Sequence, residues 1–316
     1  MSIICKIDNT EHESREAFHK YLRKIKIKQE DYYTQYETRR DKFTGNPLPF
    51  KCVDQYLATE FESRDTLRQW IKANPEAGRK WSTEWLKKRK EEKGLIYPPT
   101  QVELESLLCP TKRYYDYIGG YNKICEELGY IIRYKQDILD QSYLPEGATI
   151  IEDTREQKPI ELNVPIIREK LPYGDYGLTQ AHSSDIFIER KSGADLVGTM
   201  SSRIISKGFG EDSNFARFSR ELGRAKETGS YIITLVEEPI DWILDRNNCI
   251  YSKMKAGPDH VFHNIRELYH QFDNFQILFL CGRKEMARAI VKLLGYGESV
   301  KRVDLQYLYE CKKLTF

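Results

Sequence analysis

The chain has 316 residues, 40% of them hydrophobic and 31% charged, with a formal net charge of +2; this predicts a folded core beneath a charged surface, as two domains or one domain with an extension. The polar start excludes a secretory signal, and the lack of an apolar run of about 18 residues excludes a membrane span. Because the seven cysteines form no C-x-x-C pair, we expect reduced thiols, no structural zinc, and an intracellular location: cytoplasm or nucleoid, or the nucleus in a eukaryote.

The first 131 residues are expected to be helical. Residues 1–47 form a helical lead-in that ends at the turn sequence TGNPLP (44–49). Residues 48–131 hold short segments with apolar residues three or four apart, separated by Gly, Pro and Asn-Pro breaks, which predicts short helices around one small core. Short helices joined by tight turns are typical of helix-turn-helix units.

Positive charge is concentrated in one stretch of this region. Residues 79–93 hold seven basic and three acidic side chains beside two tryptophans. Such a stretch could face phosphates, or it could be a solvated helix face with i,i+4 ion pairs, which the charge alone favours.

The pattern changes after residue 131. Residues 132–148 are expected to be a linker. Apolar segments beyond it alternate with helical stretches, which implies crossovers between strands. We therefore predict an α/β domain over residues 149–298, with a largely parallel central sheet flanked by helices, and then a C-terminal tail over 299–316.

Charged residues gather where the strands of this domain end. Asp153 ends one apolar strand, Gly174-Asp175 opens a second, and a third runs directly into Glu189. Because side chains alternate along a strand, Glu189 and Lys191 should share one face while Arg190 points to the other.

This arrangement predicts a chemistry. A hard divalent cation such as Mg²⁺ or Mn²⁺ relieves the repulsion between clustered carboxylates and can activate a water. A lysine beside it can hydrogen-bond the water or the developing charge. The carboxylates with Lys191 therefore predict metal-dependent phosphodiester hydrolysis. Simpler explanations exist for three residues: Asp195 could cap a helix, Arg190 could be an ion-pair partner, and Gly174-Asp175 could be a turn.

The sequences DTRE (153–156), GDYGL (174–178) and ERKSGAD (189–195) also carry a resemblance. They resemble the nuclease domain of the XPF family of structure-specific DNA endonucleases, whose signature is G-D-x…-E-R-K-x-x-x-D after a strand ending in D-x-R-E. Further counterparts are DLVGTM, RFSRELGRA (217–225) and YIITLVEE, so the resemblance covers about half of the chain.

The resemblance implies a restriction-nuclease-like fold and an active site. The residues implied as catalytic are Asp153, Glu156, Asp175, Glu189, Arg190, Lys191 and Asp195. Asp175 and Glu189 would bind Mg²⁺ or Mn²⁺ together with Asp153, Glu156 would complete the acidic site, and Lys191 would serve the water.

Residues 84–130 resemble the short helical repeats associated with homing endonucleases, through Pro99-Thr100, Lys112-Arg113-Tyr114-Tyr115 and Tyr121-Asn122-Lys123. Basic residues interleaved with tyrosines suit phosphate contacts and stacking, although the tyrosines could instead form the core of a small helical domain. The candidate DNA contacts are Lys87, Lys88, Arg89, Lys112, Arg113, Tyr114, Asn122 and Lys123.

Three features depart from the XPF pattern. The hairpin between Asp175 and Glu189 is longer than usual, and GFGEDSN (208–214) has the composition of an extra loop. The helix-hairpin-helix module that usually follows the nuclease domain has no room in the 19 residues after Gly297. We therefore expect the N-terminal helices to bind the DNA.

Two other signals are discounted. Gly94-Leu-Ile-Tyr97 and Tyr117-Ile-Gly119 are similar to motifs of another nuclease class, but they flank a helical stretch. His260, His263 and His270 have quasi-ligand spacing on one helix but lack the companion residues of a zinc site.

The sequence thus predicts a metal-dependent DNA endonuclease acting on branched, flap or forked DNA. A catalytically silent DNA-binding partner subunit and a site-directed nuclease of a phage or mobile element are the alternatives. XPF-family members pair through their nuclease domains, and the apolar stripe of residues 262–272 could serve a homodimer or pack on the chain's own sheet.

Overall fold

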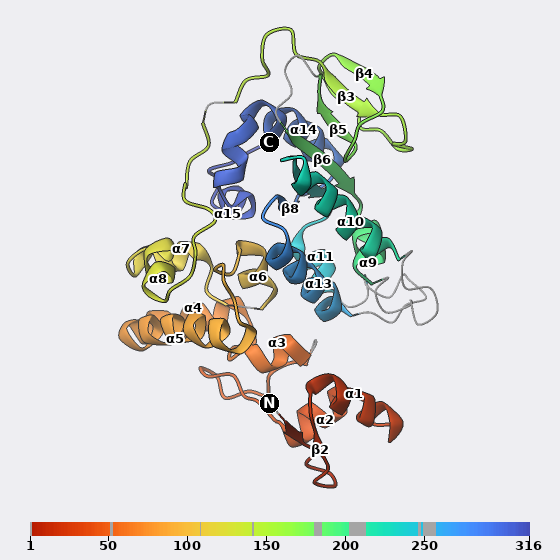
Figure 1. Ribbon diagram of the computed structural model, residues 1–316. Helices are drawn as coiled ribbons and strands as arrows, with labels where there is room; N and C mark the ends of the chain where they lie inside the picture. The colour runs from red at the N-terminus through yellow and green to blue at the C-terminus, as the bar shows by residue number, and fades with distance from the viewer. Residues whose placement is uncertain are drawn as a thin grey trace. The chain divides into compact units, whose positions relative to one another are not determined.

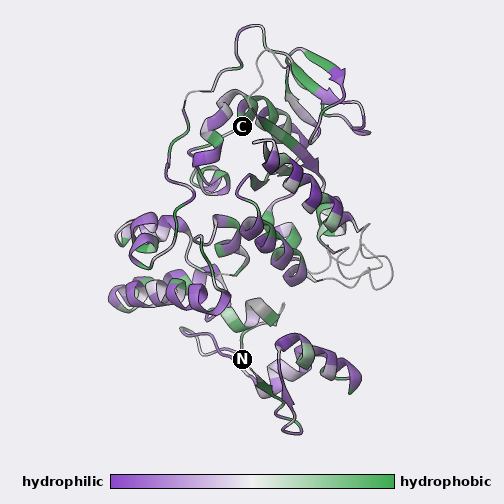
Figure 2. Ribbon diagram, viewed as in Figure 1, coloured by the Kyte–Doolittle hydropathy of each residue, from purple (hydrophilic) through white to green (hydrophobic). Residues whose placement is uncertain are grey.

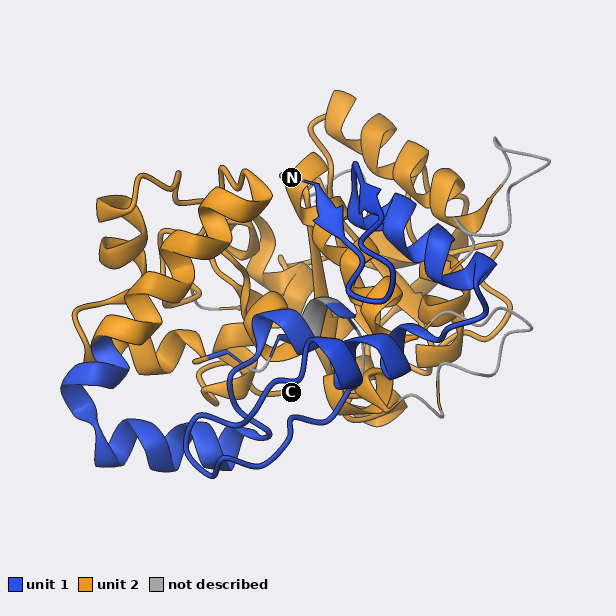
Figure 3. Cartoon of the chain, turned by 90° about the horizontal axis from the view of Figure 1, so that it is seen from below, with its two compact units in different colours: residues 1–79, 107–109 blue, residues 80–106, 110–316 orange. Residues whose placement is uncertain are grey.

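The structure is a computed structural model that describes residues 2–50, 53–107, 109–140, 142–179, 185–201, 213–245, 248 and 257–316. The chain divides into two compact units, Met1–Arg79 with Leu107–Cys109, and Lys80–Ser106 with Pro110–Phe316 (Figure 3). The expected division placed a helical domain at 48–131. The structure instead places the helices from residue 80 onward in the same unit as the sheet.

The first unit is a small hairpin with four short helices. Strand β1 (Ile3–Ile4) pairs antiparallel with β2 (Glu11–His12). The helices are α1 (Arg15–Lys24), α2 (Gln29–Tyr36), α3 (Val53–Ala58) and α4 (Arg64–Ala73). Serine side chains cap α1 and α4, since Ser14 accepts from the Ala17 N–H and Ser63 from the Thr66 N–H. The predicted lead-in, 1–47, is therefore helical over α1 and α2, and the hairpin at its start was not predicted.

The second unit begins in α5 (Pro75–Lys93), which buries Trp81, Trp85 and Leu86 while Lys87 and Lys88 are exposed. Figure 2 shows α5 as mainly hydrophilic with hydrophobic residues interspersed. Three short helices follow, α6 (Gln101–Ser106), α7 (Lys112–Tyr117) and α8 (Tyr121–Glu127). The buried residues of α5 recur three or four positions apart, as expected for a helix with one face on a core.

The second unit also contains a six-stranded sheet, in the order β4-β3-β5-β6-β7-β8 (Figure 1). Its strands are β3 (Ile150–Asp153), β4 (Ile166–Glu169), β5 (Tyr176–Leu178), β6 (Ile186–Lys191), β7 (Tyr231–Val236) and β8 (Phe275–Phe279). The pairs β3–β4, β6–β7 and β7–β8 are parallel, and β5 runs antiparallel to both of its neighbours. The predicted α/β fold with a flanked central sheet is confirmed.

Helices cover both faces of this sheet. The helices after β6 are α9 (Gly193–Ser201), α10 (Asn214–Glu227), α11 (Ile240–Leu244), α13 (Pro258–Gln271), α14 (Arg283–Tyr296), the 3₁₀ helix η3 (Gly297–Arg302) and α15 (Leu305–Glu310). One core cluster joins the sheet to α14, η3 and α15, and the other joins it to α9, α10 and α13. On β6, Ile186 and Ile188 belong to the first cluster and Phe187 packs against the second, so successive residues face opposite layers.

The C-terminal segment is part of the core and not the tail that was expected. Val300, Val303, Leu305 and Leu308 are at most 1% exposed and pack with α14 against the sheet. A tail was predicted for this short segment, but its apolar residues recur two or three positions apart and are buried in the core.

The helical segment of this unit, α5 to α8 with the residues that follow it, is connected to the sheet layer by buried polar contacts. The carboxylate of Asp304, which precedes α15, accepts from the Gln101 N–H at 2.9 Å and from Lys112 Nζ at 2.8 Å. Arg133 donates to the carbonyl of Tyr269 at 2.8 Å, near the end of α13. The predicted linker, 132–148, thus begins with residues that pack within the unit. No helix within the described residues has the length and apolar character needed to span a bilayer.

Candidate active site

A tight turn places Asp175 between two strands. Gly174 has a φ of +62°, and a Cβ on it would lie 2.7 Å from the carbonyl oxygen of Ile188. Only glycine tolerates both the left-handed backbone and this close approach. The Asp175 N–H then donates to the Ile188 carbonyl, and its carboxylate accepts from the Arg190 N–H, each at 2.7 Å. The Gly-Asp pair is therefore a turn that also holds a carboxylate against β6.

Glu189 and Lys191 lie on one face of β6, as predicted. Lys191 Nζ is 2.8 Å from Glu189 Oε1, and both side chains are largely buried. Burial, and then the neighbouring charge of Glu189, raise the pKa of Asp175 well above its ordinary value. Burial alone would lower the pKa of Lys191, but Glu189 raises it above its ordinary value, so the ammonium stays charged. The strand thus brings two carboxylates and one cation together.

Arg190 points to the opposite face of β6, also as predicted. Its Nε and Nη2 donate to the two oxygens of Glu156, each at 3.1 Å, and its Nη1 donates to Glu237 at 2.8 Å. Glu237 also accepts from Arg283 of α14 at 2.9 Å. Burial would raise the pKa of Glu156, but the hydrogen bonds from Arg190 outweigh it and the pKa is lowered. Glu156, expected to complete the acidic site, is instead the anion of this buried ion-pair network.

Asp153 has a different environment from the one predicted. Its carboxylate accepts from the side chain of Arg155 at 2.7 and 3.0 Å and from the Leu171 N–H at 2.7 Å. Burial would raise the pKa of Asp153, but the hydrogen bonds from Arg155 and the backbone lower it. These contacts use both oxygens, so Asp153 orients Arg155 after β3 and Leu171 in the connection between β4 and β5.

Asp195 caps α9. Its N–H donates to Ser192 Oγ at 3.2 Å, and the serine hydroxyl donates to the Asp195 carboxylate at 2.6 Å. This reciprocal pair is the helix cap that was weighed against a catalytic role. Within the described contacts Asp195 does not join Asp175 and Glu189.

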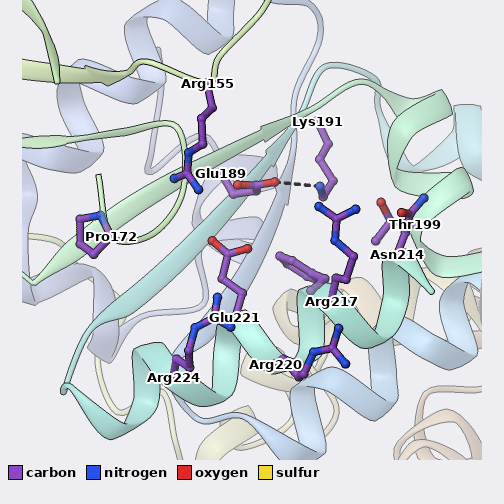
Figure 4. Close-up of a pocket in the computed structure, with 11 residues that line it drawn as sticks. Arg155, Pro172, Glu189, Lys191, Thr199, Asn214, Arg217, Arg220, Glu221 and Arg224 are labelled. Atoms are coloured by element: carbon purple, nitrogen blue, oxygen red, sulfur yellow. Dashed lines mark hydrogen bonds and ion pairs between the residues drawn. The ribbon is translucent and has the colours of Figure 1, made fainter. Parts of the chain in front are cut away.

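A cavity of about 400 Å³ opens over the face of β6 that carries Glu189 and Lys191 (Figure 4). Its other charged lining groups are Glu221, Arg155, Arg217, Arg220 and Arg224. Glu221 accepts from the Gly174 N–H at 3.2 Å, which ties α10 to the Gly-Asp turn. Burial, then Glu189, raise the pKa of Glu221.

Glu221 and the four arginines were not among the predicted site residues. The signal that would have found three of the arginines is their spacing. Arg217, Arg220 and Arg224 recur at i, i+3 and i+7, while Phe218 and Leu222 mark the buried face of the helix.

The donor set fits a hard divalent cation in part. Asp175 and Glu189 supply carboxylate oxygens, which Mg²⁺ and Mn²⁺ prefer. Burial, and then repulsion from Glu189, raise the pKa of Asp175, and a cation would relieve the repulsion. No group of three or more His, Cys, Asp or Glu side chains in the described part of the chain is arranged to hold a metal ion. Asp153, the third predicted ligand, has both oxygens bound by Arg155 and Leu171, and metal binding by Asp175 and Glu189 stays a prediction.

The predicted DNA contacts of the helical segment fall into two groups. Arg89 and Lys112 are each 6% exposed and form buried ion pairs, Arg89 with Glu103 at 3.0 Å and Lys112 with Asp304 at 2.8 Å. Their charges are satisfied inside the protein, so the prediction of a surface role is wrong for these two. Lys87, Lys88, Arg113 and Lys123 are exposed, while Tyr114 and Asn122 are partly buried.

The remaining predictions concern other elements. Gly94 follows α5 and Tyr117 ends α7, so the G-I-Y-like tripeptides are not on strands. In α13, Phe262, Ile265 and Leu268 are at most 2% exposed and belong to the core of the same chain, which removes most of the proposed dimer stripe. Residues 180–184 of the long hairpin and 208–212 of the expected loop lie outside the described residues.

Comparison with protein families agrees with this geometry. Residues 152–293 match the family described as the ERCC4 domain. The match includes all three sequences on which the resemblance was based, from Asp153 to Asp195, and it ends within α14. No curated protein matches the chain. The likeness of residues 84–130 to homing-endonuclease repeats stays a prediction.

Proposed function

Since residues 152–293 form an ERCC4 domain, the XPF-type nuclease domain of a family that acts on structured DNA, we propose that this chain is a metal-dependent endonuclease that hydrolyses phosphodiester bonds in branched or otherwise structured DNA. The observation that supports the proposal is the Glu189–Lys191 pair, which lines an open cavity, together with the buried carboxylate of Asp175 held against β6. A silent copy of the domain would have no reason to keep two repelling carboxylates at a partly buried position.

Each residue of the site would have a separate role in hydrolysis. A Mg²⁺ or Mn²⁺ ion held by Asp175 and Glu189 would lower the pKa of a water and stabilise charge on a phosphoryl oxygen. Lys191 is a hydrogen-bond donor to the attacking water or the developing phosphorane charge, because its raised pKa keeps it protonated. Arg155, held by Asp153, presents its guanidinium to the same cavity and can bind an oxygen of the substrate phosphate.

The test is cleavage by the purified full chain. Labelled flaps, forks, four-way junctions and linear duplexes are incubated with Mg²⁺, with Mn²⁺ and with EDTA, and Asp175→Asn is the matched inactive control. Metal-dependent cutting that prefers branched substrates supports the proposal. Equal cutting of a linear duplex at one sequence favours the site-directed alternative, and binding without cutting in either metal favours the silent partner subunit.

A further inference from the structure

We propose that α10 binds the sugar–phosphate backbone of the strand that is cut, through Arg220 and Arg224, with Arg217 at the phosphate nearest Lys191. The proposal rests on the proposed function for the identity of the polyanion as DNA. It assigns the grip on DNA to the nuclease domain itself, at a helix that was not among the predicted DNA contacts.

The first observation is the placement of the arginines on the helix. Helix α10 buries Phe215, Phe218, Leu222 and Ala225 against the sheet. Arg217, Arg220 and Arg224 are all exposed and line the cavity. The three guanidinium groups therefore follow one ridge, which begins beside Lys191 and runs along the cavity (Figure 4).

The second observation is an excess of positive charge in the cavity. Among the residues that the structure describes, the lining has five cationic side chains, the four arginines and Lys191, against two carboxylates, Glu189 and Glu221. Lys191 already pairs with Glu189, and Arg155 pairs with Asp153. Within the described residues Arg217 has no side-chain hydrogen bond and no ion pair, although it faces the Glu189–Lys191 pair across the cavity (Figure 4). An anion in the cavity would relieve the repulsion between these cations.

The chemistry of the arginines indicates which anion. Guanidinium groups match phosphate oxygens in a bidentate geometry and carry no information about the base. Arg217 and Arg224 are seven positions apart, which is about 10 Å along an α-helix, and this equals about three nucleotide steps of about 3.4 Å measured along the axis of a duplex. The ridge is thus long enough for a short run of consecutive phosphates that leads into the site of cleavage.

The test measures binding without metal, so that it does not depend on cleavage. The full-length protein binds a fluorescein-labelled forked duplex in EDTA over a series of salt concentrations, followed by anisotropy. The variant Arg220→Gln with Arg224→Gln is compared with Lys284→Gln with Arg288→Gln. The second pair is exposed on α14, lies outside the cavity lining and changes the net charge by the same amount. Thermal unfolding of both variants shows whether either has lost stability.

The expected result is a loss of affinity of about tenfold or more for the α10 variant. The slope of log affinity against log salt should flatten by about 2, since each lost phosphate contact removes about one released counterion. The α14 variant should keep the slope of the wild type. The variant Arg220→Lys with Arg224→Lys should also keep most of the wild-type slope. Equal behaviour of the α10 and α14 variants would overturn the inference.

The two proposals can fail separately. A wild-type protein that binds forks through α10 but cuts nothing in Mg²⁺ or Mn²⁺ contradicts the proposed function and leaves the inference in place. A wild-type protein that cuts forks while the α10 variant binds and cuts them equally well contradicts only the inference.

Discussion

The guanidinium of Arg190 holds the carboxylate of Glu156 through two nitrogen–oxygen contacts of 3.1 Å, on the face of β6 opposite Glu189 and Lys191. Two neighbouring cations of the same strand, Arg190 and Lys191, therefore have separate roles. Arg190 joins a buried network of ion pairs between the sheet and α14, and Lys191 faces the cavity. Substitutions at the two positions should have different effects.

Arg190→Ala should lower the free energy of unfolding by about 3 kcal/mol or more, because it leaves Glu156 buried without its partner. Urea or guanidinium denaturation of the full chain measures the loss. Lys284→Ala, at an exposed position on α14, is the control and should change stability little. Unchanged stability of Arg190→Ala, with only the chemical step impaired, would contradict the structural role.

Lys191→Ala should slow cleavage by about 100-fold or more, which is typical of losing one donor to the transition state. Single-turnover rates on a preferred branched substrate measure the chemical step, and anisotropy in EDTA should show nearly unchanged affinity. A normal single-turnover rate would remove Lys191 from the chemistry.

Asp175→Asn should abolish metal-dependent cleavage and keep DNA binding, because the amide preserves the shape but loses the anionic ligand. The same change should not lower the melting temperature, since it removes a carboxyl group whose pKa is raised by burial and then by repulsion from Glu189. Cleavage gels and thermal melting check the two halves of the prediction. Comparable cutting by this variant would show that the metal assignment is wrong.

Gly174→Ala should impair both stability and cleavage, because a Cβ at this φ would collide with the Ile188 carbonyl and displace Asp175. We expect a loss of unfolding free energy of about 1–3 kcal/mol. Gly198→Ala is the matched control: its Cβ would meet nothing within 4 Å inside α9, so alanine there should be neutral or slightly stabilising. Full activity of Gly174→Ala would show that the turn does not position Asp175.

Glu310→Gln should stabilise the protein at pH 8. Burial, and then the neighbouring Glu105, raise the pKa of Glu310 far above 4.5. A carboxyl with a raised folded-state pKa favours folding at low pH, and this contribution is lost as the pH rises above the unfolded value. The glutamine removes that loss, so its melting temperature should exceed that of the wild type by about 2–4 °C, equivalent to about 1 kcal/mol.

The pH dependence of the melting temperature distinguishes an effect of ionisation from a general stabilisation by the substitution. The advantage of Glu310→Gln should vanish near pH 4, where the carboxyl is protonated in both states. Glu127→Gln, at an exposed position on α8, should show no such pH dependence. An advantage of equal size at pH 4 and pH 8 would contradict the explanation by ionisation.

The local sequence pattern was enough to predict some features of this structure. Alternation along a strand separated Lys191 from Arg190 correctly, and the alternation of strands with helices indicated the flanked sheet. Both are short-range regularities, and the residues involved are neighbours in the sequence.

Long-range pairing was not accessible in the same way. Lys112 lies among basic residues and tyrosines, a pattern that indicated a phosphate contact. Its partner, Asp304, lies in a segment predicted to be a tail. Asp153 has the position of a metal ligand at a strand end, yet it is held by Arg155 two residues later and by a backbone N–H of Leu171. Whether a charge faces solvent, a ligand or another charge depends on such partners, and residue type and spacing do not specify them.

The position of Asp304 has a consequence for how the protein is made. Gln101 at the start of α6 and Lys112 at the start of α7 both donate to this carboxylate, so both helices wait for a residue synthesised about 200 positions later. The second unit therefore cannot complete its core on the ribosome until α15 has emerged. Until then Lys112 lacks its partners Asp304 and the ring of Tyr307, and the nascent chain exposes surface that favours aggregation.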